Sequence, residues 1–211
     1  MKRILVLASG RGSNFKAILD SISKGAICGT CIALITDNKQ AYAIELAKKA
    51  GIKSIVLNYS DYPDKPSYES DLLSEIQNLN PDLIVCAGYM RILGSQIIHA
   101  FPYKILNVHP ALLPAFKGLN AQRQSLEYGV KIAGCTVHFV DEYLDSGPII
   151  IQRCVPVFDT DTEQDLDDRI LHEEHIALPE AVSLFCADRL KISGRHVYII
   201  HKKRGINGTP P

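Results

Sequence analysis

Hydrophobic and polar positions in the first half of the chain predict strands that alternate with helices. Residues 4–8 form an unbroken apolar run, which is typical of a strand covered on both faces. Phe15, Ile18 and Ile22 then recur at helical spacing, and Gly25 ends the predicted helix. The same reasoning predicts strands at 31–36, 54–57, 83–87 and 104–108 and helices at 41–50, 68–79 and 95–100. This alternation predicts an α/β fold with a doubly wound, mostly parallel (Rossmann-like) sheet and helices on both faces.

The pattern changes after residue 110. A helix is predicted at 121–128, followed by β-rich runs at 135–140 and 148–157 whose linker is short enough to join antiparallel neighbours. Thr160 and Glu163 have the spacing of a capping box, which predicts the start of a long helix with a kink at Pro179. We therefore expect an antiparallel addition to the sheet in this part of the chain. We also expect a single domain over residues 1–190. Residues 191–211 would form an extension, with a short β-like stretch at 197–200, that packs on this domain or is partly frayed.

The composition narrows the choice of partners. Of the 211 residues, 23 are Lys or Arg and 23 are Asp or Glu, so the net charge gives no reason to expect nucleic acid or an anionic membrane. No apolar run reaches the roughly 18 residues that a membrane-spanning helix needs, and the run near the start is too short for a signal peptide. We expect a cytoplasmic protein with small-molecule partners, which is a monomer or a weak homodimer.

The six cysteines are too few for a secreted disulfide scaffold in a chain of this length. Cys28 and Cys31 form a Cys-x-x-Cys pair, but the pair does not open a helix after a strand and no second pair follows. Two small residues at the start of a strand are the simpler interpretation. The other Cys and His residues are scattered without the spacing of metal ligands, so we expect no metal.

A glycine-containing segment, LASGRGSN at residues 7–14, joins the first predicted strand to the first predicted helix. The amino end of a helix offers unpaired amide donors and a partial positive charge, which suit a phosphate group. Gly10 and Gly12 would let the backbone approach the anion, and Ser13 and Asn14 could cap the helix. The segment therefore favours a phosphate site, with a tight turn that binds nothing as the alternative.

Two familiar phosphate loops fit this segment less well. It lacks the Gly-Lys-Ser/Thr ending of a P-loop. Phe15 stands where the dinucleotide fingerprint has a third glycine, although Asp37 follows the second strand as that fingerprint requires. A monophosphate is the better interpretation, and a nicotinamide cofactor stays open.

Asn107 and His109 lie at the carboxyl end of the fifth predicted strand, where open parallel sheets bind their ligands. Side chains alternate along a strand, so both point the same way, and a proline directly after His109 prevents further strand pairing. An Asn amide can donate to a developing oxyanion, and a His can donate when protonated or move a proton near neutral pH. A carboxylate is a common third member because it orients the imidazole. Asp145 is one candidate, with Asp141 and Glu142 as alternatives from the same loop.

The segments NVHPALLPAFKG and GCTVHFVDEYLDSGPIIIQ resemble the signature of the folate-dependent formyltransferase family. SGRGSN is similar to the phosphate loop of the branch that acts on a phosphoribosyl substrate, and the resemblance covers roughly residues 3–190. It implies transfer of a formyl group from 10-formyltetrahydrofolate, the co-substrate, to the amine of 5′-phosphoribosylglycinamide in purine biosynthesis. It also implies that Asn107 and protonated His109 donate to the oxyanion, while Asp145 keeps His109 charged and assists proton removal.

The resemblance also assigns binding residues. Phosphoribosylglycinamide would be held by two segments, through Gly12, Ser13, Asn14 and Glu174. The folate would contact Asn107, Asp145 and a set from three further segments: Lys65, Met90, Arg91, Ile92, Leu93, Val140, Asp141 and Glu142. Lys65 would meet the glutamate tail. One position departs from the family, because Leu171 stands where relatives often carry a Gln or Lys that reaches the phosphate, so the glycine loop or His172 must supply that contact.

Other functions stay open on the sequence alone. An NAD-dependent oxidoreductase would use Gly10, Gly12 and Asp37. A formyltetrahydrofolate hydrolase of the same family would usually carry an amino-terminal regulatory domain. We expect no such domain here, because the first predicted strand begins at residue 3. A non-catalytic folate- or nucleotide-binding module would bind its ligand without turnover.

Overall fold

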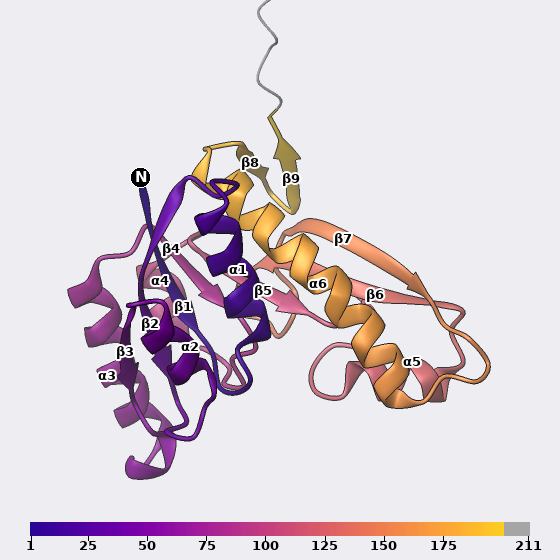
Figure 1. The fold of residues 1–211 in the computed structure, drawn as a ribbon, viewed down its shortest axis with the longest axis horizontal. Coiled ribbons are helices and arrows are strands. Elements are labelled where there is room, and N and C mark those ends of the chain that lie inside the picture. Colours follow the sequence, from indigo (N-terminus) through magenta and orange to yellow (C-terminus); the bar gives the residue numbers. More distant parts are fainter. Residues whose placement is uncertain (201–211) are drawn as a thin grey trace, which may run out of the picture.

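The computed structural model describes residues 1–200 (Figure 1). The strands of this part of the chain are β1 (Lys2–Leu7), β2 (Gly29–Thr36), β3 (Lys53–Val56), β4 (Leu83–Cys86), β5 (Ile105–His109), β6 (Ile132–Phe139), β7 (Ile149–Pro156), β8 (Leu190–Ser193) and β9 (His196–Ile199). Its helices are α1 (Ser13–Ser23), α2 (Ala43–Lys49), the short 3₁₀ helix η1 (Tyr59–Asp61), α3 (Lys65–Leu79), α4 (Ser95–Ala100), α5 (Ala121–Tyr128) and α6 (Glu163–Cys186).

The described strands form one nine-stranded sheet in the order β3-β2-β1-β4-β5-β6-β7-β9-β8. The first five strands of the chain pair in parallel, as the alternation of strands and helices predicts. The direction then reverses, because β6 pairs antiparallel with both β5 and β7. The predicted fold class, a mostly parallel doubly wound sheet with an antiparallel addition, is confirmed.

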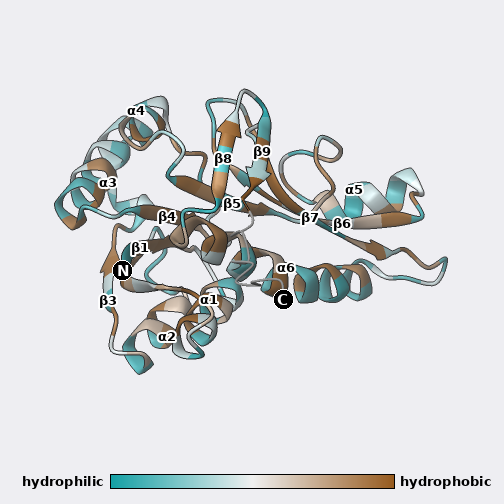
Figure 2. Ribbon diagram, turned by 90° about the horizontal axis from the view of Figure 1, so that it is seen from above, coloured by the Kyte–Doolittle hydropathy of each residue, from teal (hydrophilic) through white to brown (hydrophobic). Residues whose placement is uncertain are grey.

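Helices cover both faces of this sheet, with α3 and α4 on one side and α1, α2 and α6 on the other (Figure 2). The side chains of β1 explain why its apolar run is unbroken. Ile4 and Val6 join the core under α1 and α6, whereas Leu5 and Leu7 join the core under α3 and α4. A half-exposed strand alternates apolar and polar side chains, whereas a strand buried on both faces is apolar at every position.

Two details of the predicted helices are wrong. The capping box of α6 is formed by Thr162 and Asp165, not by Thr160 and Glu163, because the Asp165 carboxylate accepts from both the amide and the hydroxyl of Thr162. The amino end of α1 has no side-chain cap, since Gly12 is its N-cap residue. The assigned helix α6 also continues through Pro179.

The carboxyl-terminal part begins with a hairpin that the sequence predicted only in part. β9 lies close to the predicted run at 197–200, but its partner β8 was not predicted, and β8 crosses the expected boundary after residue 190. One parallel pair, Ile149 with His196, joins this hairpin to β7. The rest of the expected extension, residues 201–211, lies outside the described part of the chain.

Candidate active site

Asn107 and His109 stand near the end of β5 on the face of the sheet that α3 and α4 cover. Their strand neighbours Leu106 and Val108 point into the opposite core, so the period of two aims the amide and the imidazole to one side. Asp145, from the loop between β6 and β7, reaches the same place, with its Oδ2 3.3 Å from His109 Nδ1. The structure thus brings together the three residues that the sequence singled out for catalysis.

Both ring nitrogens of His109 face oxygen atoms. The side chain is only 5% exposed. Nε2 lies 2.8 Å from the carbonyl oxygen of Phe116, and Nδ1 faces the Asp145 carboxylate. A carbonyl and a carboxylate can only accept hydrogen bonds, so both contacts are satisfied when both ring nitrogens carry a proton.

His138 is a fourth member of this cluster, and the sequence analysis did not link it to the site. It is buried, the antiparallel register pairs it directly with Asn107, and its Nε2 lies 3.3 Å from Asn107 Nδ2. Its Nδ1 lies 2.8 Å from the Phe139 carbonyl oxygen, which accepts a hydrogen bond. Burial lowers the pKa of His138, and the Phe139 and Asp145 oxygens oppose that shift only in part. A neutral ring with Nδ1 protonated then accepts from the Asn107 amide.

The loop that carries Asp145 is held from two sides. The amide of Gly118 donates to Asp145 Oδ2 at 2.8 Å, and Asp145 itself has a positive φ of 44°. Gly147 packs so tightly that a Cβ added there would lie 1.8 Å from the carbonyl oxygen of Phe139. The carboxylate therefore keeps its place beside His109 through its own hydrogen bonds and through a contact that only glycine allows.

The other two candidate carboxylates of this loop, Asp141 and Glu142, have partners other than His109. Asp141 accepts from the amide of Tyr143 at 3.1 Å, and Glu142 lies 2.5 Å from Nε2 of His99 on α4. The structure therefore favours Asp145 among the three candidates. Asp141 and Glu142 lie at the surface of the same loop, and Val140 packs against the core under α3 and α4.

The glycine segment leads into α1 as predicted, but its glycines differ in role. Gly12 has a φ of 73°, and an added Cβ would lie 2.8 Å from the Cβ of Ala43, so close packing against α2 requires glycine. A Cβ added at Gly10 would meet no atom within 4 Å, so there is room for a ligand beside the backbone at this residue. Helix α1, which begins at Ser13, points its amino end into this region.

Asn14 and Glu174, 160 positions apart, meet beside the glycine segment. Asn14 Nδ2 donates to Glu174 Oε2 at 2.7 Å, so this side chain supports the carboxylate and does not cap the helix. Both residues are buried, with 6% and 7% of their surface exposed, and Asn14 Oδ1 has no partner in the described residues. Burial raises the pKa of Glu174 to about 7, and the Asn14 hydrogen bond opposes that shift. Glu174 is therefore not part of a solvated acidic face. Leu171, one turn earlier, is half-buried, and His172 is exposed.

The residues expected at the folate form a second group. A cavity of about 230 Å³ is lined by the segment from Tyr89 to Leu93 and by residues of η1 and α3, Lys65 among them. Lys65 lies 3.4 Å from Glu69, and Met90 and Ile92 are each more than 60% exposed. The described structure brings five of the expected folate residues to this one cavity: Lys65, Met90, Arg91, Ile92 and Leu93.

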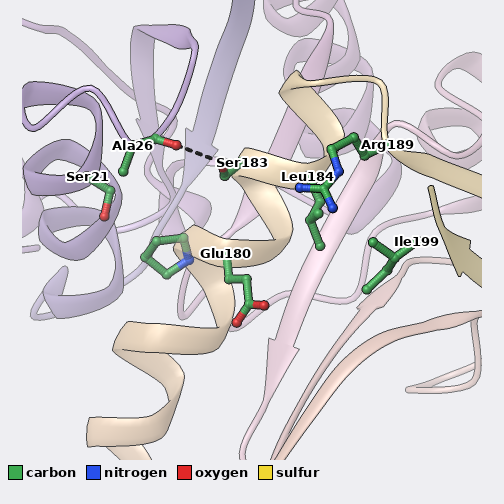
Figure 3. Close-up of a pocket in the computed structure, with 8 residues that line it drawn as sticks. Ser21, Ala26, Glu180, Ser183, Leu184, Arg189 and Ile199 are labelled. Carbon is green, nitrogen blue, oxygen red and sulfur yellow. Dashed lines mark hydrogen bonds between the residues drawn. The ribbon is translucent and has the colours of Figure 1, made fainter. Parts of the chain in front are cut away.

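A larger cavity of about 340 Å³ lies elsewhere, between α1, α6 and the carboxyl-terminal hairpin (Figure 3). It contains none of the predicted site residues. Its Glu180 is paired with Arg153 at 2.9 Å, and Ser183 donates to the Ala26 carbonyl at 2.6 Å. These polar groups already have partners within the protein, so this cavity offers less for a ligand to bind.

The residues that a dinucleotide site or a Cys-x-x-Cys site would use have structural roles instead. Phe15 is fully buried against the sheet, and the Asp37 carboxylate accepts from Arg91 Nε at 2.8 Å, so neither is available to a dinucleotide. Cys28 and Cys31 are free thiols, and burial raises the pKa of Cys31 to about 12, which suits a packed side chain.

The described part of the chain offers neither a cluster of metal ligands nor a helix that could span a membrane. Residues 1–200 contain no group of three or more His, Cys, Asp or Glu side chains arranged to hold a metal ion. Among the helices of the same residues, none is long and apolar enough to cross a membrane.

Comparisons with known proteins agree with this geometry. Residues 2–182 match the formyl transferase family model. The phosphoribosylglycinamide formyltransferase of Escherichia coli (strain K12) is 41% identical over 189 residues, which is 90% of this chain and 89% of that protein. The trifunctional purine biosynthetic protein adenosine-3 of Bos taurus is 37% identical over 93% of this chain but only 20% of its own length.

Solved structures give the same result. Glycinamide ribonucleotide transformylase 1 from Symbiobacterium toebii superposes with a TM-score of 0.93 and 49% identity over 95% of each chain. A formyltetrahydrofolate deformylase from Pseudomonas syringae shares the fold at 22% identity, and this chain covers 66% of that one. The match to most of the chain and the high identity to full-length relatives show that this protein belongs to the formyl transferase family.

Proposed function

We propose that this protein transfers a formyl group from 10-formyltetrahydrofolate to the amine of 5′-phosphoribosylglycinamide in purine biosynthesis. The observation that carries the proposal is the cluster of Asn107, His109 and Asp145, in which a buried imidazole has acceptors at both nitrogens beside an amide donor. The relatives named phosphoribosylglycinamide formyltransferase support the choice of substrate. We further propose that residues 1–190 act as one domain.

The reaction starts when the amine lone pair attacks the formyl carbon and the carbonyl electrons move to oxygen. Asn107 has two N–H bonds, and neutral His138 accepts only one of them, so the other can donate to the developing oxyanion. The His109 cation lies on the same face and stabilises the same negative charge. His109 Nε2 can donate directly to the oxyanion once its hydrogen bond to the Phe116 carbonyl oxygen is broken.

Collapse of the tetrahedral intermediate breaks the bond between the formyl carbon and N10 of the folate. The attacking amine loses one proton and N10 gains one, so the overall step neither consumes nor releases a proton. Asp145 is the group of this cluster that can accept the proton and return it, through a water molecule, while it holds His109 in place.

The two binding regions fit the two substrates. The amino end of α1, with Gly12, Ser13 and Asn14, would receive the phosphate, and Glu174 would accept hydrogen bonds from the ribose hydroxyls. The folate would lie along the segment from Met90 to Leu93 and the loop from Val140 to Asp145, with Lys65 near its glutamate tail.

The test is an assay with purified protein and both substrates. We expect the folate absorbance change and the formylated product to appear together, in equal amounts, only when the phosphoribosylglycinamide is present. Release of tetrahydrofolate without the amine would indicate a hydrolase and contradict the proposal. NADH fluorescence should show no saturable binding, and binding would instead support an oxidoreductase.

A further inference from the structure

Asp37 follows β2 directly and is a buried carboxylate that neither the fold nor the proposed reaction requires. Only 5% of the residue is exposed. Its Oδ2 accepts from Arg91 Nε at 2.8 Å, while its Oδ1 is buried without a partner in the described residues. A carboxylate in such a place is costly unless a cation accompanies it, so Asp37 and Arg91 depend on each other.

Tyr59 supports the same guanidinium from a second direction. The centre of the Arg91 guanidinium lies 3.9 Å from the centre of the Tyr59 ring, a cation–π distance. The amide of Tyr59 donates to the carbonyl oxygen of Asp37 at 3.0 Å. Asp37 therefore fixes Arg91 through its side chain and Tyr59 through its backbone.

This arrangement leaves most of the guanidinium free to bind a ligand. Among the described residues, the recorded hydrogen bond of Arg91 uses Nε alone, so the four N–H bonds of the two terminal nitrogens stay available. The Arg91 side chain is 43% exposed and lines the cavity of about 230 Å³. Two terminal N–H groups in one plane match the two oxygens of a carboxylate.

Lys65 is the second cation of the same cavity. It is the first residue of α3 and lines the cavity together with Arg91. Its partner Glu69 neutralises one of these two charges, at 3.4 Å. The remaining positive charge at the cavity is that of Arg91, whose own partner Asp37 lies behind it in the protein.

We propose that Asp37 and Tyr59 are positioning residues that hold Arg91 so that its terminal nitrogens bind a carboxylate on the tail of the formyl donor. The inference rests on the proposed function, because it takes the donor to be an acidic folate. Asp37 does not touch the donor. It acts through the orientation of Arg91, which explains why an acidic residue stands next to a site for an acidic ligand.

The experiment compares two donors that differ only in the tail. One is 10-formyltetrahydrofolate, and the other is the amide of 10-formyltetrahydropteroate (called the pteroate below), which lacks the glutamate and has no carboxylate. Asp37→Asn keeps the shape of the side chain and removes its charge. We expect KM for the folate to rise about tenfold, the effect of one misdirected charge-assisted hydrogen bond, with kcat unchanged. KM for the pteroate should stay at the wild-type value.

Two controls separate positioning from general damage. Asp61→Asn changes an exposed aspartate at the other end of η1 and should leave both KM values unchanged. In an Arg91→Ala background, Asp37→Asn should have no further effect on KM for the folate. Tyr59→Leu removes the ring and keeps the ion pair, so it should raise the same KM by a smaller factor, and it serves as the test if Asp37→Asn does not fold.

The outcomes distinguish the two proposals. If the wild-type protein uses neither donor, the proposed function fails. If it uses both, but Asp37→Asn and Tyr59→Leu leave KM for the folate unchanged or change both donors equally, the positioning role is wrong and the proposed function stands.

Discussion

Gly147 makes the placement of the catalytic loop testable with one methyl group. An alanine Cβ at this position would lie 1.8 Å from the carbonyl oxygen of Phe139 and 2.9 Å from its carbonyl carbon. Real Cβ atoms essentially never approach closer than 3.0 Å, so the loop must move away from β6 by at least 3.0 − 1.8 = 1.2 Å. Asp145 is two residues earlier in the same loop and moves with it.

This displacement predicts the size of the loss. The contact between Asp145 Oδ2 and His109 Nδ1 is already 3.3 Å, so a further 1.2 Å takes it beyond hydrogen-bond distance. A misplacement of about 1 Å in a catalytic group can cost about 10²-fold in rate. We therefore expect Gly147→Ala to lower kcat/KM about 10²-fold.

The assay is steady-state formyl transfer, with the thermal midpoint of unfolding measured in parallel. Ser146→Ala is the matched control, because it changes a neighbouring side chain and keeps the carbonyl that accepts from Arg195 at 2.6 Å. This control should stay within about twofold of wild type, as is usual for a surface substitution. A folded Gly147→Ala protein with nearly wild-type kcat/KM would refute the argument that this contact sets the position of Asp145.

Four further predictions concern the cluster, the ribose site and the core. Asn107→Ala should lower kcat about 10²–10³-fold in the same assay, because one oxyanion donor is lost. Asp145→Asn should lower kcat about 10²–10⁴-fold, and a loss below tenfold would contradict its role. Burial raises the pKa of Glu174 from its ordinary value of 4.5 to about 7, so the folded state holds this proton more tightly than the unfolded state. Relative to Glu174→Gln, the free energy of unfolding of wild type should therefore fall by about 3 kcal/mol as pH rises from about 4.5 to about 7, measured by urea denaturation, and a flat difference would contradict this. Leu72→Ala, in a fully buried position of α3, should cost about 2–5 kcal/mol of stability in the same measurement and leave kcat of the folded protein unchanged.

The sequence was most informative where a single segment determines the result. Residues 4–8 had to be a strand with two buried faces because their apolar run has no polar position, and Asn107 and His109 had to point the same way because a strand has a period of two. Local signals failed where two of them overlap. Thr160 with Glu163 and Thr162 with Asp165 both fit a capping box, and only the folded chain decides which pair forms.

Contacts between distant segments could not be predicted from patterns. Nothing in the sequence around Asn14 indicates that its amide bonds Glu174, because the two residues meet only after α1 and α6 pack together. His138 is a similar case. Its link to Asn107 depends on the register between β5 and β6, and a shift of one residue would turn its side chain to the other face.

The reversal of strand direction between β5 and β6 has a consequence for when the protein can become active during its synthesis. Asn107 and His109 belong to the parallel part of the sheet, whereas His138 and Asp145 arrive later, on the antiparallel β6 and the loop that follows it. A nascent chain that has folded only its first five strands carries half of the cluster and cannot catalyse. Formyl transfer should therefore begin, during synthesis or refolding, only when β6 docks along β5, and it can serve as a direct readout of that event.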